Sequence, residues 1–210
     1  MSARTRIGVL ALQGAFAAHV AALTRLGAES REVRVPGDLD ECDALVMPGG
    51  ESTTMSKLLE TSALFDPIAK RITDGMPVFG TCAGMILLAR DVADGRPDQR
   101  SFGAIDIDVQ RNAYGRQVDS FETDIALRGD AEPFHAVFIR APRITRCGGA
   151  VEVLAEYAGA AVLVRSNAVM AASFHPELAN DDRVHRMFLG TFFDASLDTV
   201  RDKHRDTATE

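Results

Sequence analysis

The 210-residue chain has little of several features that mark particular classes of protein. It contains three cysteines, Cys42, Cys82 and Cys147, and no CxxC pair. An odd number of cysteines without paired spacing fits neither a disulfide framework nor a thiolate zinc site, and it is typical of a reducing compartment. We interpret Cys42 and Cys147 as structural, since free cysteine usually behaves as a small hydrophobic residue.

An excess of positive charge and long apolar runs are also missing. The formal net charge is −7, so no surplus of lysine and arginine is available for phosphates, which disfavours a general nucleic-acid binder. No uninterrupted apolar run approaches the length of a membrane-spanning helix. The N-terminal stretch IGVLALQGAFAA faintly imitates a signal peptide, but Gln13 and Gly14 interrupt it, and a strand followed by a helix fits it better.

Two nucleotide-binding motifs are absent as well. The sequence has no GxxxxGK[ST] string and no GxGxxG string, which leaves a phosphate loop or a dinucleotide fold with little support. Hydrophobic residues make up 46% of the chain and charged residues 25%, an ordinary globular balance. We expect one domain over residues 1–196, followed by a polar tail over 197–210.

Strand-like and helix-like segments alternate through the first half of the chain. RIGVLAL, SREVRV, DALVMP and MPVFG read as strands, and AFAAHVAALTRLG, TTMSKLLETSALF and CAGMILLARDVA read as helices. This alternation predicts a parallel sheet with helices on both faces. After about residue 95, short β-type runs such as IDIDVQ, HAVFIRA and VMAASF predict hairpins or an antiparallel extension of the sheet. The segment DDRVHRMFLGTFFDASL predicts a closing amphipathic helix.

The junction GTCAG at 80–84 places Cys82 between a predicted strand and a predicted helix. Its GxCxG form matches the nucleophile elbow, whose glycines permit a tight turn and close backbone approach. A helix N-terminus favours a thiolate over a thiol. The N–H of Ala83 would point into the same space and hold a developing oxyanion. A buried, inert cysteine between two accidental glycines is the alternative.

A thiol nucleophile needs a proton acceptor, and HPE at 175–177 offers one. Side chains two apart in an extended segment point the same way, so Glu177 would accept a hydrogen bond from His175 and fix its tautomer. Cys82, His175 and Glu177 would then form a catalytic triad. A plain loop after a strand is the alternative for HPE. We interpret the other histidines as ordinary surface or core residues: His19, His135, His185 and His204.

The segment MPGGEST repeats the order of strand, glycine turn and helix. Gly50 would add a second N–H to an oxyanion hole formed with Ala83. Glu51 and Ser52 would hold polar parts of a substrate at the carboxyl end of the sheet, where ligands of open α/β sheets bind.

Three separated segments, PGGEST at 48–53, GTCAG at 80–84 and HPE at 175–177, together resemble class I glutamine amidotransferases. The strings GVLALQGAFAAH, QRNAYGRQVDSFE, FIRAP and SFHPEL narrow the resemblance to the glutaminase subunits of pyridoxal 5′-phosphate synthase, over about residues 6 to 195. The resemblance implies a flavodoxin-like three-layer α/β fold with a mostly parallel sheet. It adds Arg111, Ile139 and Arg140 to the residues expected to bind L-glutamine, beside Gly50, Glu51 and Ser52.

The same resemblance implies a reaction and a partner. Cys82 would attack the side-chain amide of glutamine to give a thioester and ammonia, and water activated by His175 would release glutamate. No cofactor and no metal would take part. The ammonia would pass to a (βα)₈-barrel synthase subunit in the cytoplasm, which builds pyridoxal 5′-phosphate from ribose 5-phosphate and glyceraldehyde 3-phosphate. No membrane and no nucleic acid would be a partner.

Two alternatives remain open at this level. A glutaminase subunit of another pathway, such as imidazole glycerol phosphate synthesis, would share the same triad chemistry. A non-catalytic α/β module could instead use an activated Cys82 to bind a partner and sense redox state.

Overall fold

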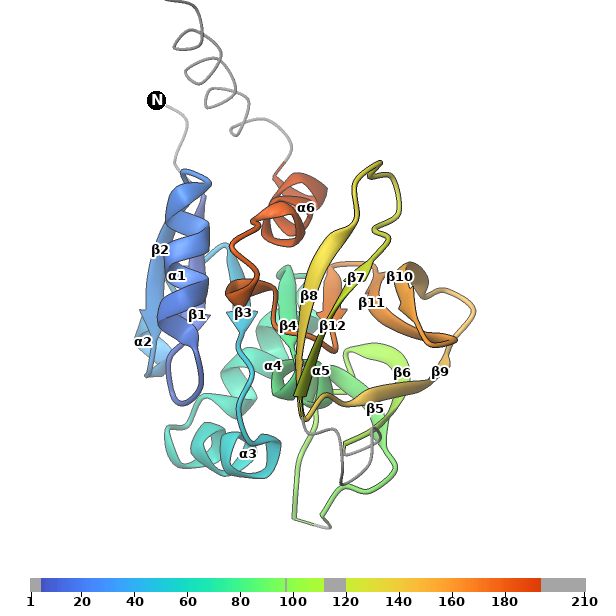
Figure 1. The fold of residues 1–210 in the computed structure, drawn as a ribbon. Coiled ribbons are helices and arrows are strands. Elements are labelled where there is room, and N and C mark those ends of the chain that lie inside the picture. Colours follow the sequence, from blue (N-terminus) through green and yellow to red (C-terminus); the bar gives the residue numbers. More distant parts are fainter. Residues whose placement is uncertain (1–4, 97, 112–119, 194–210) are drawn as a thin grey trace, which may run out of the picture.

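The computed structural model describes residues 5–96, 98–111 and 120–193 (Figure 1). The predicted tail 197–210 and most of the QRNAYGRQ motif lie outside the described residues.

A seven-stranded sheet forms the centre of the molecule, in the order β10-β11-β12-β4-β3-β1-β2 (Figure 1). The five strands from β12 to β2 are parallel, and β10 and β11 extend the sheet by antiparallel pairing. The predicted α/β fold with a mostly parallel sheet and an antiparallel extension is confirmed. The strands are β1 (Arg6–Leu10), β2 (Glu29–Val33), β3 (Ala44–Met47), β4 (Val78–Thr81), β10 (Glu152–Tyr157), β11 (Ala160–Ser166) and β12 (Val169–Ala172).

Alternation along the strands divides the hydrophobic core into two layers. In β1, Ile7 and Val9 pack on one face of the sheet and Leu10 packs on the other, as the period of two requires. Helices α1 and α6 cover the first face, whereas α3, α4 and α5 cover the second (Figure 1). The helices are α1 (Phe16–Arg25), α2 (Pro36–Leu39), α3 (Ser52–Thr61), α4 (Phe65–Thr73), α5 (Ala83–Leu88) and α6 (Arg183–Phe192).

The structure corrects the helix predicted over CAGMILLARDVA. Helix α5 ends at Leu88, and β5 (Ala89–Val92) follows at once and pairs with β6 (Ile105–Gln110). The carbonyls of Leu87 and Leu88 accept hydrogen bonds from the N–H groups of Phe102 and Ala104. The returning chain therefore supplies the hydrogen bonds that a further helical turn would have made, and this tertiary pairing overrides the helical pattern.

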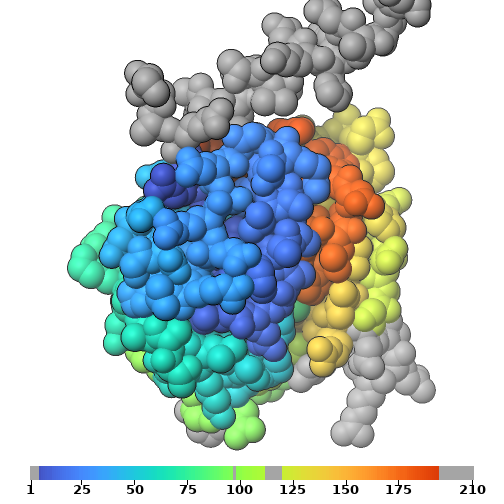
Figure 2. Space-filling view, turned by 90° about the vertical axis from the view of Figure 1, so that its left-hand side faces the viewer, coloured from blue at the N-terminus to red at the C-terminus, as the bar shows by residue number. Residues whose placement is uncertain are grey.

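Two small sheets sit beside the central one. Strands β5, β6 and β9 (Arg143–Cys147) form the first, and the hairpin of β7 (Ser120–Ile125) and β8 (Phe134–Ile139) forms the second. Strand β12 pairs antiparallel with β11, as the hairpin prediction requires, and on its other side it runs parallel to β4. After β12 the chain turns through a short 3₁₀ helix, η1 (Pro176–Leu178), and η1 packs against α1. Figure 2 shows the C-terminal segment, in orange, directly beside the blue surface of α1.

The carboxyl ends of β1, β3, β4 and β12 meet at one edge of the sheet, because parallel neighbours end on the same side (Figure 1). The segments that leave these ends carry the predicted site residues, including Gly50, Cys82 and His175. Within the described ranges, no helix is long and apolar enough to cross a membrane.

The packing of Gly84 yields a stability prediction. A Cβ at Gly84, in α5, would lie 2.1 Å from the carbonyl oxygen of Met47 on the neighbouring strand β3. We expect Gly84→Ala to lower the free energy of unfolding by about 2 kcal/mol or more, because backbone must move to admit the methyl group. Urea denaturation would measure the change.

Gly190→Ala, in α6, is the matched control. No atom lies within 4 Å of a Cβ at this position. Alanine should therefore be neutral or stabilise the helix by up to about 1 kcal/mol. Equal stabilities of wild type and Gly84→Ala would contradict the close packing of α5 on β3.

Candidate active site

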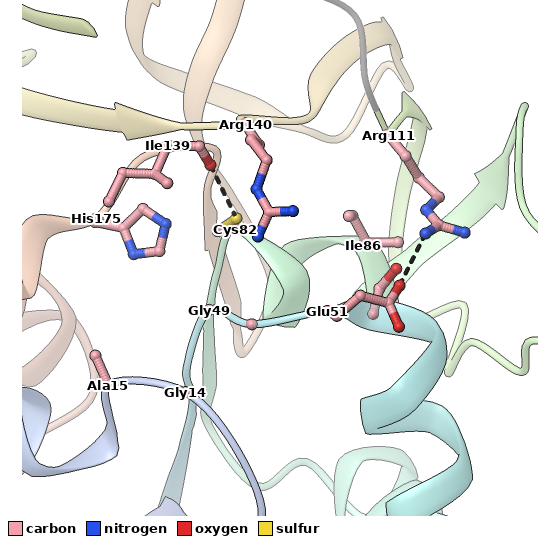
Figure 3. A pocket seen from close by; sticks show the side chains of 12 residues that line it. Gly14, Ala15, Gly49, Glu51, Cys82, Ile86, Arg111, Ile139, Arg140 and His175 are labelled. Atoms are coloured by element: carbon pink, nitrogen blue, oxygen red, sulfur yellow. Dashed lines mark hydrogen bonds and ion pairs between the residues drawn. The ribbon is translucent and has the colours of Figure 1, made fainter. Parts of the chain in front are cut away.

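A pocket of about 440 Å³ opens at the carboxyl edge of the sheet (Figure 3). A cavity of this size accommodates a molecule as small as an amino acid. Ala83 and Glu177 are buried and lie outside the pocket lining. The other residues predicted from the sequence all line the pocket: Gly50, Glu51, Ser52, Cys82, Arg111, Ile139, Arg140 and His175.

Cys82 occupies the turn between β4 and α5 with an unusual backbone conformation. Its φ is 50° and its ψ is −104°, a region that residues other than glycine rarely occupy and that costs about 1–3 kcal/mol. The N–H of Cys82 donates to the carbonyl oxygen of Ala172 at 2.8 Å, which ties the turn to β12. A Cβ at Gly80 would lie 2.6 Å from the backbone of Gly84. The two glycines of the predicted elbow therefore permit the backbone to cross itself closely.

His175 and Glu177 form the predicted hydrogen bond, but a different local structure produces it. His175 Nδ1 lies 2.8 Å from Glu177 Oε1. The segment is not extended, because Pro176–Leu178 forms a 3₁₀ turn. Pro176 starts this turn readily, since its φ is fixed and its missing N–H is not needed there. The N–H of His175 also donates to the carbonyl oxygen of Val137, which anchors the histidine to β8.

The pKa values of His175 and Glu177 are shifted in opposite directions. Burial lowers the pKa of His175, but the neighbouring Cys82 and the hydrogen bond to Glu177 outweigh burial and raise it to about 10. Burial raises the pKa of Glu177, but the hydrogen bond to His175 reverses the balance and leaves that pKa below its usual value. A protonated imidazole beside a sulfur favours the nucleophilic thiolate. With Nδ1 bonded to Glu177, the other ring nitrogen of His175 is left for proton transfer.

The glycine turn of MPGGEST packs against the side chains of Cys82 and His175. A Cβ at Gly49 would lie 2.4 Å from His175 Cε1 and 3.3 Å from the Cβ of Cys82. Gly50 has a φ of 152° and lines the pocket, while Ala83 is the first residue of α5, where helical N–H groups have no partner within the helix. The Cys82 sulfur lies 4.0 Å from the carbonyl oxygen of Ile139 (Figure 3).

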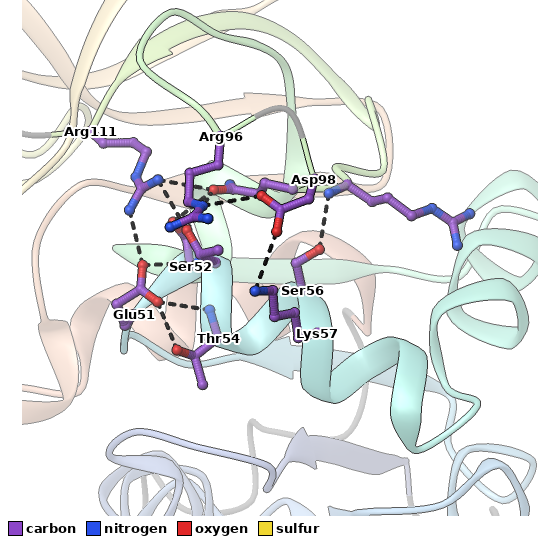
Figure 4. Close-up of polar contacts among 11 residues, drawn as sticks. Glu51, Ser52, Thr54, Ser56, Lys57, Arg96, Asp98 and Arg111 are labelled. Atoms are coloured by element: carbon purple, nitrogen blue, oxygen red, sulfur yellow. Dashed lines mark hydrogen bonds and ion pairs between the residues drawn. The ribbon is translucent and has the colours of Figure 1, made fainter.

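The predicted substrate ligands Glu51 and Arg111 contact each other across the pocket wall (Figure 4). Arg111 Nη2 lies 2.9 Å from Glu51 Oε1, and its Nη1 donates to Thr53 Oγ1 and Gln99 Oε1, both at 3.1 Å. Glu51 also caps α3 by accepting from the N–H groups of Thr53 and Thr54. Burial opposes ionisation of this carboxyl, but the hydrogen bonds from the two threonines lower the pKa of Glu51 to about 2. Ser52 Oγ lies 3.5 Å from Gln99 Oε1.

Among the residues that the structure describes, Arg140 is the second cation that lines the pocket. Its φ of 42° lies in the left-handed region, and its guanidinium extends along the pocket in Figure 3. Within the part of the chain that the structure describes, this side chain makes no hydrogen bond or ion pair. Arg140 is therefore available to an anionic group in a way that Arg111 is not.

Sequence reasoning missed several residues of the site. Gly14, Ala15 and Ile86 also line the pocket, beside Gly49 of the predicted MPGGEST turn. A signal for Gly14 was present, because LQG follows the first strand in the same order of strand, glycine and helix as the other two loops. His19 and His185, interpreted as ordinary residues, are both fully buried, and His19 lies against the Glu177 carboxylate. Among the described residues, no group of three or more His, Cys, Asp or Glu side chains could hold a metal ion.

Gly49→Ala should displace the imidazole of His175, because the added methyl group would overlap its ring. We expect the rate of Cys82 alkylation by iodoacetamide at pH 7 to fall by about tenfold, since the thiolate loses the adjacent positive charge. Mass spectrometry of the Cys82 peptide would measure the rate. Gly37→Ala, where no atom lies within 4 Å of a Cβ, is the control, and an unchanged rate in Gly49→Ala would contradict this arrangement.

The lowered pKa of Glu51 predicts a pH-dependent stability. A carboxyl whose folded pKa is about 2, below its ordinary value of 4.5, stabilises the fold fully above pH 4.5. That contribution is lost as the pH falls from about 4.5 toward about 2. We expect the free energy of unfolding of wild type to exceed that of Glu51→Gln by about 0.5 kcal/mol at pH 7. This difference should shrink as the pH falls.

Thermal unfolding between pH 2.5 and pH 7 would measure this gap. Glu156→Gln, at an exposed position of β10, measures the effect of the amide substitution by itself. A stability difference that widens as the pH falls would contradict the conclusion that an ionised Glu51 caps α3.

Comparisons with known proteins agree with this geometry. The model of the SNO glutamine amidotransferase family matches residues 9–194. A Salinispora arenicola protein named pyridoxal 5′-phosphate synthase subunit PdxT is 56% identical over 188 residues, which cover 87% of this chain and 94% of that protein. A protein of the same name from Nocardioides sp. is 55% identical over 194 residues, covering 90% and 96%. A crystal structure described as a glutamine amidotransferase superposes with a TM-score of 0.82 at 50% identity, covering 87% of this chain and 96% of that one. The chain therefore belongs to the SNO glutamine amidotransferase family.

Proposed function

We propose that this chain is the glutaminase subunit of a pyridoxal 5′-phosphate synthase. It hydrolyses L-glutamine to L-glutamate and ammonia through Cys82, His175 and Glu177. The observation that carries the proposal is the meeting of a cysteine elbow with a hydrogen-bonded His–Glu pair at one pocket. The names of relatives that are 55–56% identical over most of the chain support the pathway.

The first half of the reaction forms a thioester. The thiolate of Cys82 attacks the side-chain amide carbon of glutamine, and the carbonyl oxygen takes up the negative charge. The N–H groups of Gly50 and Ala83 stabilise that oxyanion. The imidazolium of His175 gives its proton to the departing nitrogen, so the C–N bond breaks and ammonia leaves.

The second half releases glutamate. His175, now neutral, takes a proton from water as the water oxygen attacks the thioester carbon. Collapse of the second oxyanion breaks the C–S bond and restores the thiolate beside an imidazolium. Glu177 keeps the imidazole in one tautomer through both steps and stabilises its positive form.

The charged residues of the pocket suit the zwitterionic end of the substrate. Arg140, which has no partner among the described residues, takes the α-carboxylate of glutamine, and Arg111 adds positive charge on the same side. Glu51, ionised at neutral pH, takes the α-ammonium group. Ser52 and the backbone at Gly50 and Ile139 complete the binding surface.

The ammonia passes to the barrel-shaped synthase subunit in the cytoplasm, where pyridoxal 5′-phosphate is built. The triad alone fits a glutaminase of another pathway equally well, and the relatives' names favour this one. A redox-sensing module would not need a base held by a buried carboxylate beside its cysteine.

The test combines the purified chain with the barrel subunit, ribose 5-phosphate, glyceraldehyde 3-phosphate and glutamine. Pyridoxal 5′-phosphate, followed by its absorbance, should form well above the glutamine-free background. Cys82→Ala should lower the glutamine-dependent rate by about 10³-fold or more, because the nucleophile is gone. Added ammonium salt should restore product formation, since the barrel subunit remains intact.

Cys147→Ala is the control, because Cys147 lies on β9 outside the pocket. This variant should keep the wild-type rate. Product at the glutamine-free level in wild type, or full glutamine-dependent activity in Cys82→Ala, would overturn the proposal.

A further inference from the structure

A pair of buried histidines lies behind the catalytic carboxylate. Glu177 uses Oε1 to contact His175, and its Oε2 lies 3.3 Å from His19 Nε2, with both side chains fully buried. His19 Nδ1 lies 2.9 Å from His185 Nε2. A continuous series of polar contacts thus runs from α6 through α1 to the triad. Figure 2 shows the blue N-terminal and orange C-terminal segments side by side at the surface.

The contacts of these rings select one arrangement of protons. Glu177 Oε2 is a buried acceptor that has no hydrogen-bond partner among the described groups, and His19 Nε2 lies 3.3 Å from it. If His19 carries its proton on Nε2, the ring points a donor at Oε2, and Nδ1 then accepts from His185 Nε2–H. The opposite tautomers would place a ring lone pair against the carboxylate and leave a buried N–H of His185 without a partner.

We propose that His19 is a positioning residue for the glutaminase reaction, whose Nε2–H holds Oε2 of Glu177 so that Oε1 stays against His175. This inference rests on the proposed glutaminase function. His185 acts one step further away by fixing the tautomer of His19. The distance of 3.3 Å is longer than the ~2.8 Å of a strong charged hydrogen bond, and catalytic hydrogen bonds often shorten only when substrate binds.

Both histidines serve as neutral donors. Burial lowers the pKa of His19, and burial lowers that of His185 to about 3. A neutral donor satisfies Oε2 and leaves the negative charge of Glu177 for the imidazolium of His175. The charged or titratable groups that face His19 are Glu177, His175 and His185. Two charged groups, Asp182 and Arg25, act on His185 from further away. They form an ion pair with each other, with Arg25 Nη2 2.7 Å from Asp182 Oδ1.

His19 also contacts the strand that carries the nucleophile. Thr81 Oγ1 lies 3.3 Å from His19 Nε2, and Thr81 directly precedes Cys82. The donor therefore lies between the two halves of the triad, which come from β4 and from the turn after β12. Thr81 Oγ1 and Glu177 Oε2 therefore lie at the same distance from one nitrogen of His19.

The test compares His19→Gln with His19→Leu. Gln can still donate to Oε2, since its Nε2 reaches about as far as that of histidine, whereas Leu cannot. Leu23→Ala is the matched control. Leu23 is fully buried one turn further along α1, so its substitution removes apolar packing alone. His135→Gln, on the exposed hairpin, controls for the loss of a histidine.

Two readouts are measured for each variant. The first is kcat and KM for glutamine in the complex with the barrel subunit. The second is the rate of Cys82 alkylation by iodoacetamide as a function of pH, with and without that subunit. Without the donor, Oε1 of Glu177 is no longer held against His175, so the imidazolium loses its partner and the thiolate of Cys82 should form only at higher pH.

We expect His19→Leu to lower kcat by about tenfold or more at nearly unchanged KM, and to raise the midpoint of the alkylation profile by about one pH unit. His19→Gln should recover most of both changes. His185→Phe should shift the midpoint in the same direction by a smaller amount, and it provides a second variant should His19→Leu fail to fold.

A midpoint that stays at the wild-type pH in every folded variant would overturn the proposal. The proposal would also be overturned if His19→Gln, His19→Leu and Leu23→Ala lost kcat equally and in proportion to their melting temperatures. That result would show that His19 contributes packing alone. Failure of wild type to release ammonia from glutamine would instead refute the proposed function, and the alkylation midpoint would still report on Glu177.

Discussion

The site depends on a single tight turn in which Cys82 adopts a positive φ. This conformation is costly for a residue with a side chain, so the surroundings must hold it in place. Gly80 lets β4 and α5 approach each other, Gly84 lets α5 approach β3, and a hydrogen bond to Ala172 fixes the N–H of Cys82. The turn sets the sulfur at the start of α5 and at the edge of the sheet. The loops from β1, β3 and β12 are arranged around that point.

A buried carboxylate is the second constraint. Glu177 is fully shielded from solvent at its side chain, and an isolated charge there would be strongly destabilising. His175 contacts one oxygen and His19 lies against the other, so the charge interacts with groups from the turn after β12 and from α1. The chain thereby holds the imidazole through a network in its interior, whereas the charges of Glu51 and Arg111 lie in the pocket wall.

The parallel part of the fold could be predicted because its strands are buried on both faces and alternate with helices. The prediction was wrong where tertiary hydrogen bonds outweighed local pattern. After Leu88 the returning chain captures the last carbonyls of α5, and the helix gives way to β5. At Pro176 the chain forms a 3₁₀ turn where an extended segment was expected, yet the same hydrogen bond results.

The sequence by itself determined which chemical groups are present and in what order. A cysteine between glycines, a glycine loop before a helix, and His–Pro–Glu after a strand each reflect local rules of backbone geometry. Only the tertiary structure decided which groups meet. His19 and His185 lie 166 positions apart, and no local pattern marks them, because their contact arises from the packing of α1 and α6 on one face of the sheet. Local sequence encodes dihedral preferences, whereas distances between remote side chains follow from how the sheet orders its strands.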